Sequence, residues 1–267
     1  MGTYFNPDNM RFTDDVNSDI YVDKTGLIAE MNRKINKTNR CVVVSHARRF
    51  GKTQAANMLE AYYSSGCDSK DLFSKFKAAD SVDFEKHLNK YNVIHLDIAS
   101  ITSSVDEKVV DGIRQRLVCD FKKVYPDVDY SSSLELILLD IFKKSERRFV
   151  VIIDEWDSVI RNYADKTEAV HEYMQLLHVL FKSMESAQFL ALGYMTGILP
   201  IKKIKDESAL NNFTEYTMLD SGELAPYYGF TEAEVRELCD KFDMSFDAVK
   251  NWYNGYLLNG MHMYNPN

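Results

Sequence analysis

The chain has 267 residues, of which 45% are hydrophobic, 12% aromatic and 27% charged. This composition excludes intrinsic disorder, collagen-like repeats and low-complexity tracts, and a chain of this length buries enough surface to need no disulfide framework. Its 32 Lys and Arg and 40 Asp and Glu give a net charge of −8, which argues against broad binding to nucleic acid or an anionic membrane. A small basic site for a small anion is compatible with this charge.

The cysteines and the N-terminal residues indicate a cytoplasmic protein. Cys41, Cys67, Cys119 and Cys239 form no C-x-x-C pair, so no zinc ribbon or redox motif is readable and reduced thiols are expected. The N-terminal segment lacks the basic and apolar stretches of a secretory signal, and no long apolar run predicts a membrane span. We therefore expect a cytoplasmic location and no membrane partner.

Helical and strand patterns alternate along the chain. A short helix with Thr25 as its N-cap precedes the first strand. Strands are predicted at 40–45, 92–98, 148–154, 188–196 and 215–219, and helices at 52–65, 106–125, 132–145 and 168–186. The last helix carries an apolar stripe of Val170, Met174, Leu177, Leu180, Phe181 and Met184. This alternation predicts an α/β fold with helices packed on a mostly parallel five-stranded sheet.

The pattern changes after about residue 220. Thr231 and Glu234 form a predicted capping box at the start of a helix, and helices are expected to dominate from there onward. We therefore expect a core at residues 1–220, in which 1–38 form an N-terminal segment and helix, and a small helical appendage at 221–267 that stops abruptly.

The most informative stretch is the loop between the first strand and the helix that follows it. Gly51 permits a close backbone approach to a phosphate, Lys52 supplies a positive charge, and the Thr53 hydroxyl can bind a magnesium ion. The residues expected to bind nucleotide are Arg48, Arg49, Phe50, Gly51, Lys52, Thr53 and Gln54. His46 replaces the first glycine of the general phosphate-loop pattern. A tight turn that merely uses glycine is the alternative.

A second motif places two adjacent carboxylates after a buried strand. Asp154 is expected to hold magnesium together with Thr53, and Glu155 to orient or polarise the attacking water. The alternative is that Asp154 caps the next helix. Thr196 lies at the end of the fourth strand, where its hydroxyl could sense the outer phosphate or hold the water. The alternative is that it makes only backbone contacts.

Several motifs in order resemble the bacterial AAA-ATPase-like family, whose members often carry a nuclease-like domain after the ATPase module. The resemblance covers nearly the whole chain and rests on Tyr21-Val22-Asp23-Lys24-Thr25, Arg48-Arg49-Phe50-Gly51-Lys52-Thr53, Ile153-Asp154-Glu155-Trp156-Asp157, Thr196-Gly197-Ile198-Leu199-Pro200-Ile201-Lys202-Lys203, Ser208-Ala209-Leu210-Asn211-Asn212-Phe213, Gly229-Phe230-Thr231 and Trp252-Tyr253-Asn254-Gly255-Tyr256. No nuclease-like cluster is visible in the sequence itself.

The resemblance implies a P-loop NTPase of the additional-strand type. In this fold, a three-layer αβα sandwich has an extra strand between the phosphate-loop strand and the acidic strand, and a helical lid follows. Gly51, Lys52 and Thr53 then resemble the phosphate and magnesium residues, and Asp154 and Glu155 the metal-holding and water-activating carboxylates. The chain accordingly resembles an N-terminal part of a longer protein.

The resemblance and the motifs together predict an ATP-binding protein that uses Mg²⁺ to hydrolyse ATP, with Glu155, Lys52 and Thr196 as catalytic residues. Hydrolysis would drive a conformational change in a regulatory or DNA-linked system. The alternative is a nucleotide-gated switch or scaffold without significant turnover. Arg48 and Arg49 could bind nucleotide, a neighbouring subunit of a homo-oligomer or a nucleic-acid phosphate, or pair with surface acids.

Overall fold

The computed structural model describes residues 2–105, 107–203, 210–253 and 255–265. At its centre lies a five-stranded sheet in the order β2-β3-β4-β1-β5, and every neighbouring pair in it is parallel. The strands are β1 (Cys41–Ser45), β2 (Asn92–Asp97), β3 (Phe149–Asp154), β4 (Leu190–Gly197) and β5 (Thr214–Thr217). This confirms the predicted sheet, and β4 is the extra strand between the phosphate-loop strand β1 and the acidic strand β3.

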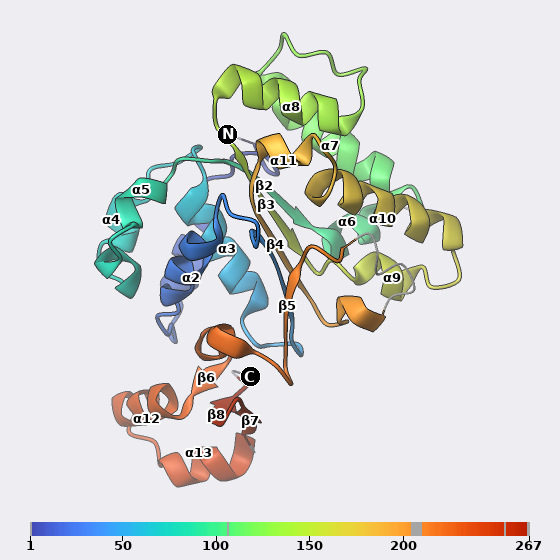
Figure 1. Cartoon of the computed structure of the whole chain (residues 1–267). Coiled ribbons are helices and arrows are strands. Elements are labelled where there is room, and N and C mark those ends of the chain that lie inside the picture. The colour runs from blue at the N-terminus through green and yellow to red at the C-terminus, as the bar shows by residue number, and fades with distance from the viewer. Residues whose placement is uncertain (1, 106, 204–209, 254, 266–267) are drawn as a thin grey trace.

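Helices cover both faces of the sheet, which gives the three layers of an αβα sandwich (Figure 1). On the first face lie α2 (Gly26–Lys34), α3 (Lys52–Tyr63), α4 (Lys70–Phe73) and α5 (Phe84–His87). On the second lie α6 (Ile98–Ser104), α7 (Val109–Val124), α8 (Leu134–Ser145), α9 (Ser158–Asn162), α10 (Thr167–Phe181) and α11 (Ser186–Phe189). Helix α1 (Met10–Val16) packs on α3, and η1 (Lys77–Asp80) and η2 (Ile201–Lys203) are short 3₁₀ turns.

Two separate apolar cores follow from the alternation of side chains along the strands. Val42 and Val44 of β1 face the core that includes α2 and α3, whereas Cys41 and Val43 face the core that includes α7, α8 and α10. Because successive side chains of a strand point to opposite faces, a strand covered on both faces is apolar throughout its length. This explains why the strand segments were recognisable from near-continuous hydrophobicity.

Three details of the predicted elements differ from the structure. Thr25 occupies the N-cap position of α2, but its hydroxyl donates to Asp23 Oδ1 at 2.6 Å and accepts the Ala78 N–H at 3.0 Å, so it does not cap the helix. Helix α10 ends at Phe181, and Met184 is 86% exposed instead of continuing the apolar stripe. The Ser183 hydroxyl accepts the Ser186 N–H at 3.0 Å, which starts a new helical turn there.

The third difference concerns the C-terminal part, which contains strands as well as helices. The turn η4 (Gly222–Tyr227) leads into a three-stranded antiparallel sheet made of β6 (Phe230–Thr231), β7 (Tyr256–Leu258) and β8 (Met261–Tyr264). The expected helices are α12 (Glu232–Lys241) and α13 (Phe246–Tyr253). This small sheet was not predicted, because strands of only two to four residues are too short to show an alternating pattern.

Polar contacts join the C-terminal part to the core. Lys24 Nζ donates to the Glu234 carboxylate at 2.6 Å and to the Pro226 carbonyl at 2.7 Å. The Gly229 N–H donates to the carbonyl of Phe50, in the phosphate loop, at 3.1 Å. In Figure 1 this part lies below the sheet, next to the end of β5.

Some predicted features fall outside the described residues. These are Asp106 at the start of the second predicted helix, Ser208 and Ala209 of one family motif, and Asn254 of another. Within the described ranges, no helix is long and apolar enough to cross a lipid bilayer.

The predicted capping box of α12 is present, because Thr231 Oγ1 accepts the Glu234 N–H and the Glu234 carboxylate accepts the Thr231 N–H. Thr231→Ala removes the first of these bonds, and we expect it to lower the free energy of unfolding by about 1 kcal/mol. Urea unfolding measures the change. Glu237→Ala, on the exposed face of the same helix, is the control and should change stability by less than about 0.5 kcal/mol; equal effects of the two variants would contradict the assignment.

Candidate functional site

The loop from β1 to α3 places a helix N-terminus at the carboxyl edge of the sheet. Gly51 is the N-cap residue of α3 and has φ +75°, a left-handed conformation that glycine adopts without steric cost. The first N–H groups of an α-helix have no acceptor within the helix and carry its positive dipole end. An anion at this point is therefore bound by backbone groups as well as by side chains.

Lys52 is held in the loop rather than extended into solvent. Its side chain is 5% exposed, and Nζ donates to the carbonyl of Ala47 at 2.8 Å. Burial lowers the pKa of Lys52, and the carboxylates of Glu155, Asp154 and Asp157 oppose this effect. The ammonium group is thus surrounded by the loop carbonyl and by the acidic motif.

Asp154 connects three elements of the site. One carboxylate oxygen, Oδ2, accepts the hydroxyl of Thr53 from α3 at 2.6 Å. The other, Oδ1, accepts the hydroxyl of Thr196 from β4 and the N–H of Glu155. Asp154 does not cap the next helix, since Asp157 occupies the N-cap position of α9.

Thr196 is completely buried, and its hydroxyl donates to Asp154. Its hydroxyl reaches neither solvent nor the cavity described below, and it does not make only backbone contacts. It lies between the two motifs, as expected, because β4 pairs with both β1 and β3. From this position its hydroxyl holds the carboxylate of Asp154.

Glu155 has a left-handed backbone conformation, with φ +51°, and lies half-buried beside Arg161. Its Oε2 accepts from the Arg161 guanidinium at 2.6 Å. Burial raises the pKa of Glu155, while Lys52 and Arg161 oppose this shift. Arg161 was not predicted to have a role. The signal that could have found it is its position four residues after Asp157, because this spacing on a helix allows an ion pair.

A cavity of about 400 Å³ brings most of the predicted site residues together. Its lining consists of Arg48, Arg49, Gly51, Lys52, Thr53, Gln54 and Glu155. We call it the phosphate cavity. Arg48 and Arg49 are both exposed at its rim, so three cationic side chains face one carboxylate.

Phe50 does not line the phosphate cavity and is fully buried. Its ring contacts His46 and Tyr256 with centroid separations of 6.0 and 5.4 Å. His46 is also buried and packs on Tyr228 at 5.0 Å. Both residues therefore connect the loop to the C-terminal part of the chain.

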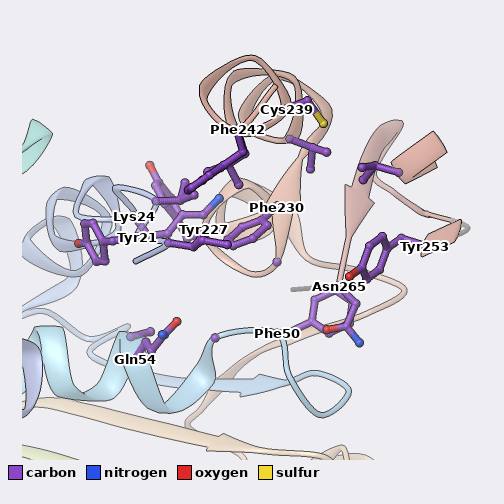
Figure 2. A pocket seen from close by; sticks show the side chains of 18 of the residues that line it. Tyr21, Lys24, Phe50, Gln54, Tyr227, Phe230, Cys239, Phe242, Tyr253 and Asn265 are labelled. Carbon is purple, nitrogen blue, oxygen red and sulfur yellow. The ribbon is translucent and has the colours of Figure 1, made fainter. Parts of the chain in front are cut away.

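A second cavity, also of about 400 Å³, lies between the core and the C-terminal part (Figure 2). Its walls are mainly apolar and include Phe12, Tyr21, Met58, Phe230, Leu238 and Phe242. Gly51 and Gln54 line this cavity and the phosphate cavity, so the two adjoin at the start of α3. We call the second one the apolar cavity.

The donor set at the phosphate cavity suits magnesium. The hydroxyl of Thr53 and the carboxylate of Asp154 are hard oxygen ligands 2.6 Å apart, and magnesium in proteins usually keeps several waters and only one or two protein ligands. Among the described residues, no group of three or more His, Cys, Asp or Glu side chains could hold a metal ion.

The burial of His46 makes a pH dependence testable. Burial, helped by Lys52, lowers the pKa of His46 to about 4, from 6.5. The imidazole therefore binds a proton more readily in the unfolded chain than in the folded one. The contribution of neutral His46 to the free energy of unfolding is fully present above pH 6.5 and is lost as the pH falls toward 4. Between pH 7 and pH 5, His46→Gln should lose about 2 kcal/mol less unfolding free energy than the wild type. Urea unfolding at both pH values checks this, and equal losses would contradict the buried neutral imidazole.

Comparison with known proteins agrees with the geometry. The family model described as "Predicted AAA-ATPase" matches residues 13–205. The chain is similar to an "Uncharacterized protein in vnfD 5'region" of Azotobacter chroococcum mcd 1, with 21% identity over 252 residues that cover 92% of this chain and 46% of the relative. The chain thus spans less than half the length of that relative.

Two solved structures of the Aeropyrum pernix ORC2 protein, an ADPNP and ADP complex and an ADP form, align with a TM-score of 0.44 each. Their identities to this chain are 12% and 11%, and the alignments cover 86% and 88% of this chain and 55% of each of those chains. The family model covers well over half of the residues. The chain therefore belongs to the predicted AAA-ATPase family, whose model matches residues 13–205.

Proposed function

We propose that this chain binds ATP with magnesium and hydrolyses it. The observation that carries the proposal is the phosphate cavity, where a helix N-terminus, Lys52, Thr53 and Glu155 meet. Each of these groups has a use in phosphoryl transfer to water, and their combination is typical of that reaction.

The triphosphate is bound by the loop and the first turn of α3. Lys52 exchanges its bond to the Ala47 carbonyl for phosphate oxygens, and the N–H groups at the start of α3 donate to the same anion. Arg48 and Arg49 stand at the rim, where guanidinium groups pair with phosphate oxygens. Magnesium would be held by Thr53 and Asp154 and would neutralise charge on the outer phosphates.

Glu155 accepts the proton of the attacking water. The water oxygen forms a bond to the γ-phosphorus, the bond between that phosphorus and the bridging oxygen breaks, and ADP leaves with the electron pair. Glu155 is suited to this step because its carboxylate lines the phosphate cavity. Thr196 supports the reaction by holding Asp154.

The nucleoside occupies the apolar cavity. This cavity has the volume and mainly apolar lining of small-molecule sites, and it adjoins the phosphate cavity at Gly51 and Gln54. The aromatic rings of Tyr21, Phe230 and Phe242 offer stacking surfaces for a base (Figure 2). Because one wall belongs to the C-terminal part, residues 221–267 would act as a lid over the nucleotide.

A nucleotide-gated switch without significant turnover is the second candidate. The bond from Gly229 N–H to the Phe50 carbonyl favours it, since a phosphate loop that moves on binding would move the C-terminal part with it. Both candidates predict that ATP stabilises the protein by RT ln(1 + [L]/Kd). They differ in turnover. In either case, the protein would act in a regulatory or DNA-linked system. The family resemblance suggests that a nuclease-like domain and a homo-oligomer would take part.

Glu155→Gln distinguishes the two candidates. We expect the wild type to release phosphate from ATP in the presence of magnesium, and Glu155→Gln to do so at least about 100-fold more slowly with ATP affinity within about threefold. The amide cannot accept the proton but retains the shape of the side chain. Phosphate release and calorimetric titration measure the two quantities. Absent turnover in both proteins, under conditions where ATP binds, would favour the switch.

Leu238→Trp tests the nucleoside site because it fills the apolar cavity without touching the phosphate cavity. We expect ATP affinity to fall at least about tenfold, while inorganic tripolyphosphate, which has no base, binds as in the wild type. Leu257→Trp, at a residue that is 66% exposed on β7, is the control. Equal ATP affinity in all three proteins would place the base elsewhere.

A further inference from the structure

We propose that Arg161 is a positioning residue that aims the Glu155 carboxylate at the phosphate cavity, an inference that rests on the proposed hydrolysis. Arg161 lies on α9, six residues after Glu155 and outside the loop that would bind nucleotide. Arg161 is not among the described residues that line the phosphate cavity. It therefore acts through Glu155 rather than on the ligand.

The guanidinium group binds two carboxylates at once. Its Nη2 donates to Glu155 Oε2 at 2.6 Å, and its Nε donates to Asp157 Oδ2 at 2.9 Å. Nη2 also donates to the Ser158 hydroxyl at 3.1 Å. A planar guanidinium with fixed donor directions holds both acids in one relative orientation, which a lysine ammonium does not.

Asp157 anchors this arrangement to the sheet. It is fully buried, and its carboxylate accepts the N–H groups of Ile198 at 3.3 Å and Leu199 at 3.0 Å. These two residues directly follow β4, so Arg161 is attached through Asp157 to the end of a central strand. Gly197 allows this close packing, because a Cβ there would lie 2.6 Å from Trp156 and 2.7 Å from Asp157 Oδ1.

The anchor fixes a side chain that otherwise has several rotamers. Glu155 is only half-buried, and the Arg161 guanidinium holds its carboxylate. Arg161 binds Oε2, which leaves Oε1 available to accept the proton of a water in the phosphate cavity. Holding a reacting group in the attacking geometry accelerates a reaction without changing substrate affinity.

The test compares steady-state kcat and ATP affinity in Arg161→Gln, Arg161→Lys, Glu155→Gln and the double variant Arg161→Gln/Glu155→Gln. We expect Arg161→Gln to lower kcat at least about tenfold while the Kd for a nonhydrolysable ATP analogue changes less than about threefold. Arg161→Lys should have an intermediate kcat, because it keeps the charge but loses the fork. The double variant should match Glu155→Gln alone, since residues that act as a unit are non-additive.

Arg33→Gln, which breaks an exposed pair with Glu30 on α2, is the matched control and should leave kcat unchanged. An unchanged or increased kcat in Arg161→Gln would overturn the inference, as would a loss of kcat that adds fully to that of Glu155→Gln. If Arg161→Gln does not fold, Arg161→Lys decides by the same criterion of reduced kcat at unchanged Kd. A wild type without turnover would instead overturn the proposed hydrolysis, and this inference with it.

Discussion

The pair of hydroxyl bonds to Asp154 is the interaction on which the rest of the site depends. Thr53 comes from the helix that follows β1, Thr196 from the end of β4, and Asp154 from the end of β3. Three neighbouring strands are thereby joined at one carboxylate. Because parallel strands bring their carboxyl ends to one edge, a single acid can fix the position of the phosphate loop relative to the acidic motif.

The same constraint extends to the C-terminal part of the chain through the loop itself. Phe50 and His46 belong to the loop, yet their side chains point away from the phosphate cavity and pack against Tyr228 and Tyr256. His46 stands where the general phosphate-loop pattern has glycine. Its larger side chain is buried and packs against Tyr228. A ligand that reorders this loop therefore acts on both the core and the C-terminal part. That coupling is the physical basis of the proposed conformational change.

The sequence was sufficient to predict the core sheet, and several of the residues predicted to bind nucleotide line one cavity in the structure. Continuous apolar strands are easily recognised: Lys52 begins the helix after the loop that follows β1, and Asp154 is the last residue of β3. It was not sufficient for features that depend on tertiary contacts. The apolar stripe does not show that α10 ends at Phe181, two residues before the serine whose hydroxyl accepts the Ser186 N–H. The Thr25 hydroxyl accepts the N–H of Ala78, which lies in a distant turn, and the strands β6 to β8 are too short to show a period. Arg161 was missed because its role requires the Glu155 backbone conformation, which no sequence pattern specifies.

We propose that one nucleotide with one metal ion joins the phosphate cavity to the apolar cavity. A crystal structure with a nonhydrolysable ATP analogue and Mn²⁺, whose anomalous signal locates the ion, tests it most directly. We expect the triphosphate at the N-terminus of α3 beside Lys52, the ion next to Thr53 and Asp154, and the base in the apolar cavity. An analogue bound elsewhere, or an ion distant from Thr53 and Asp154, would contradict it.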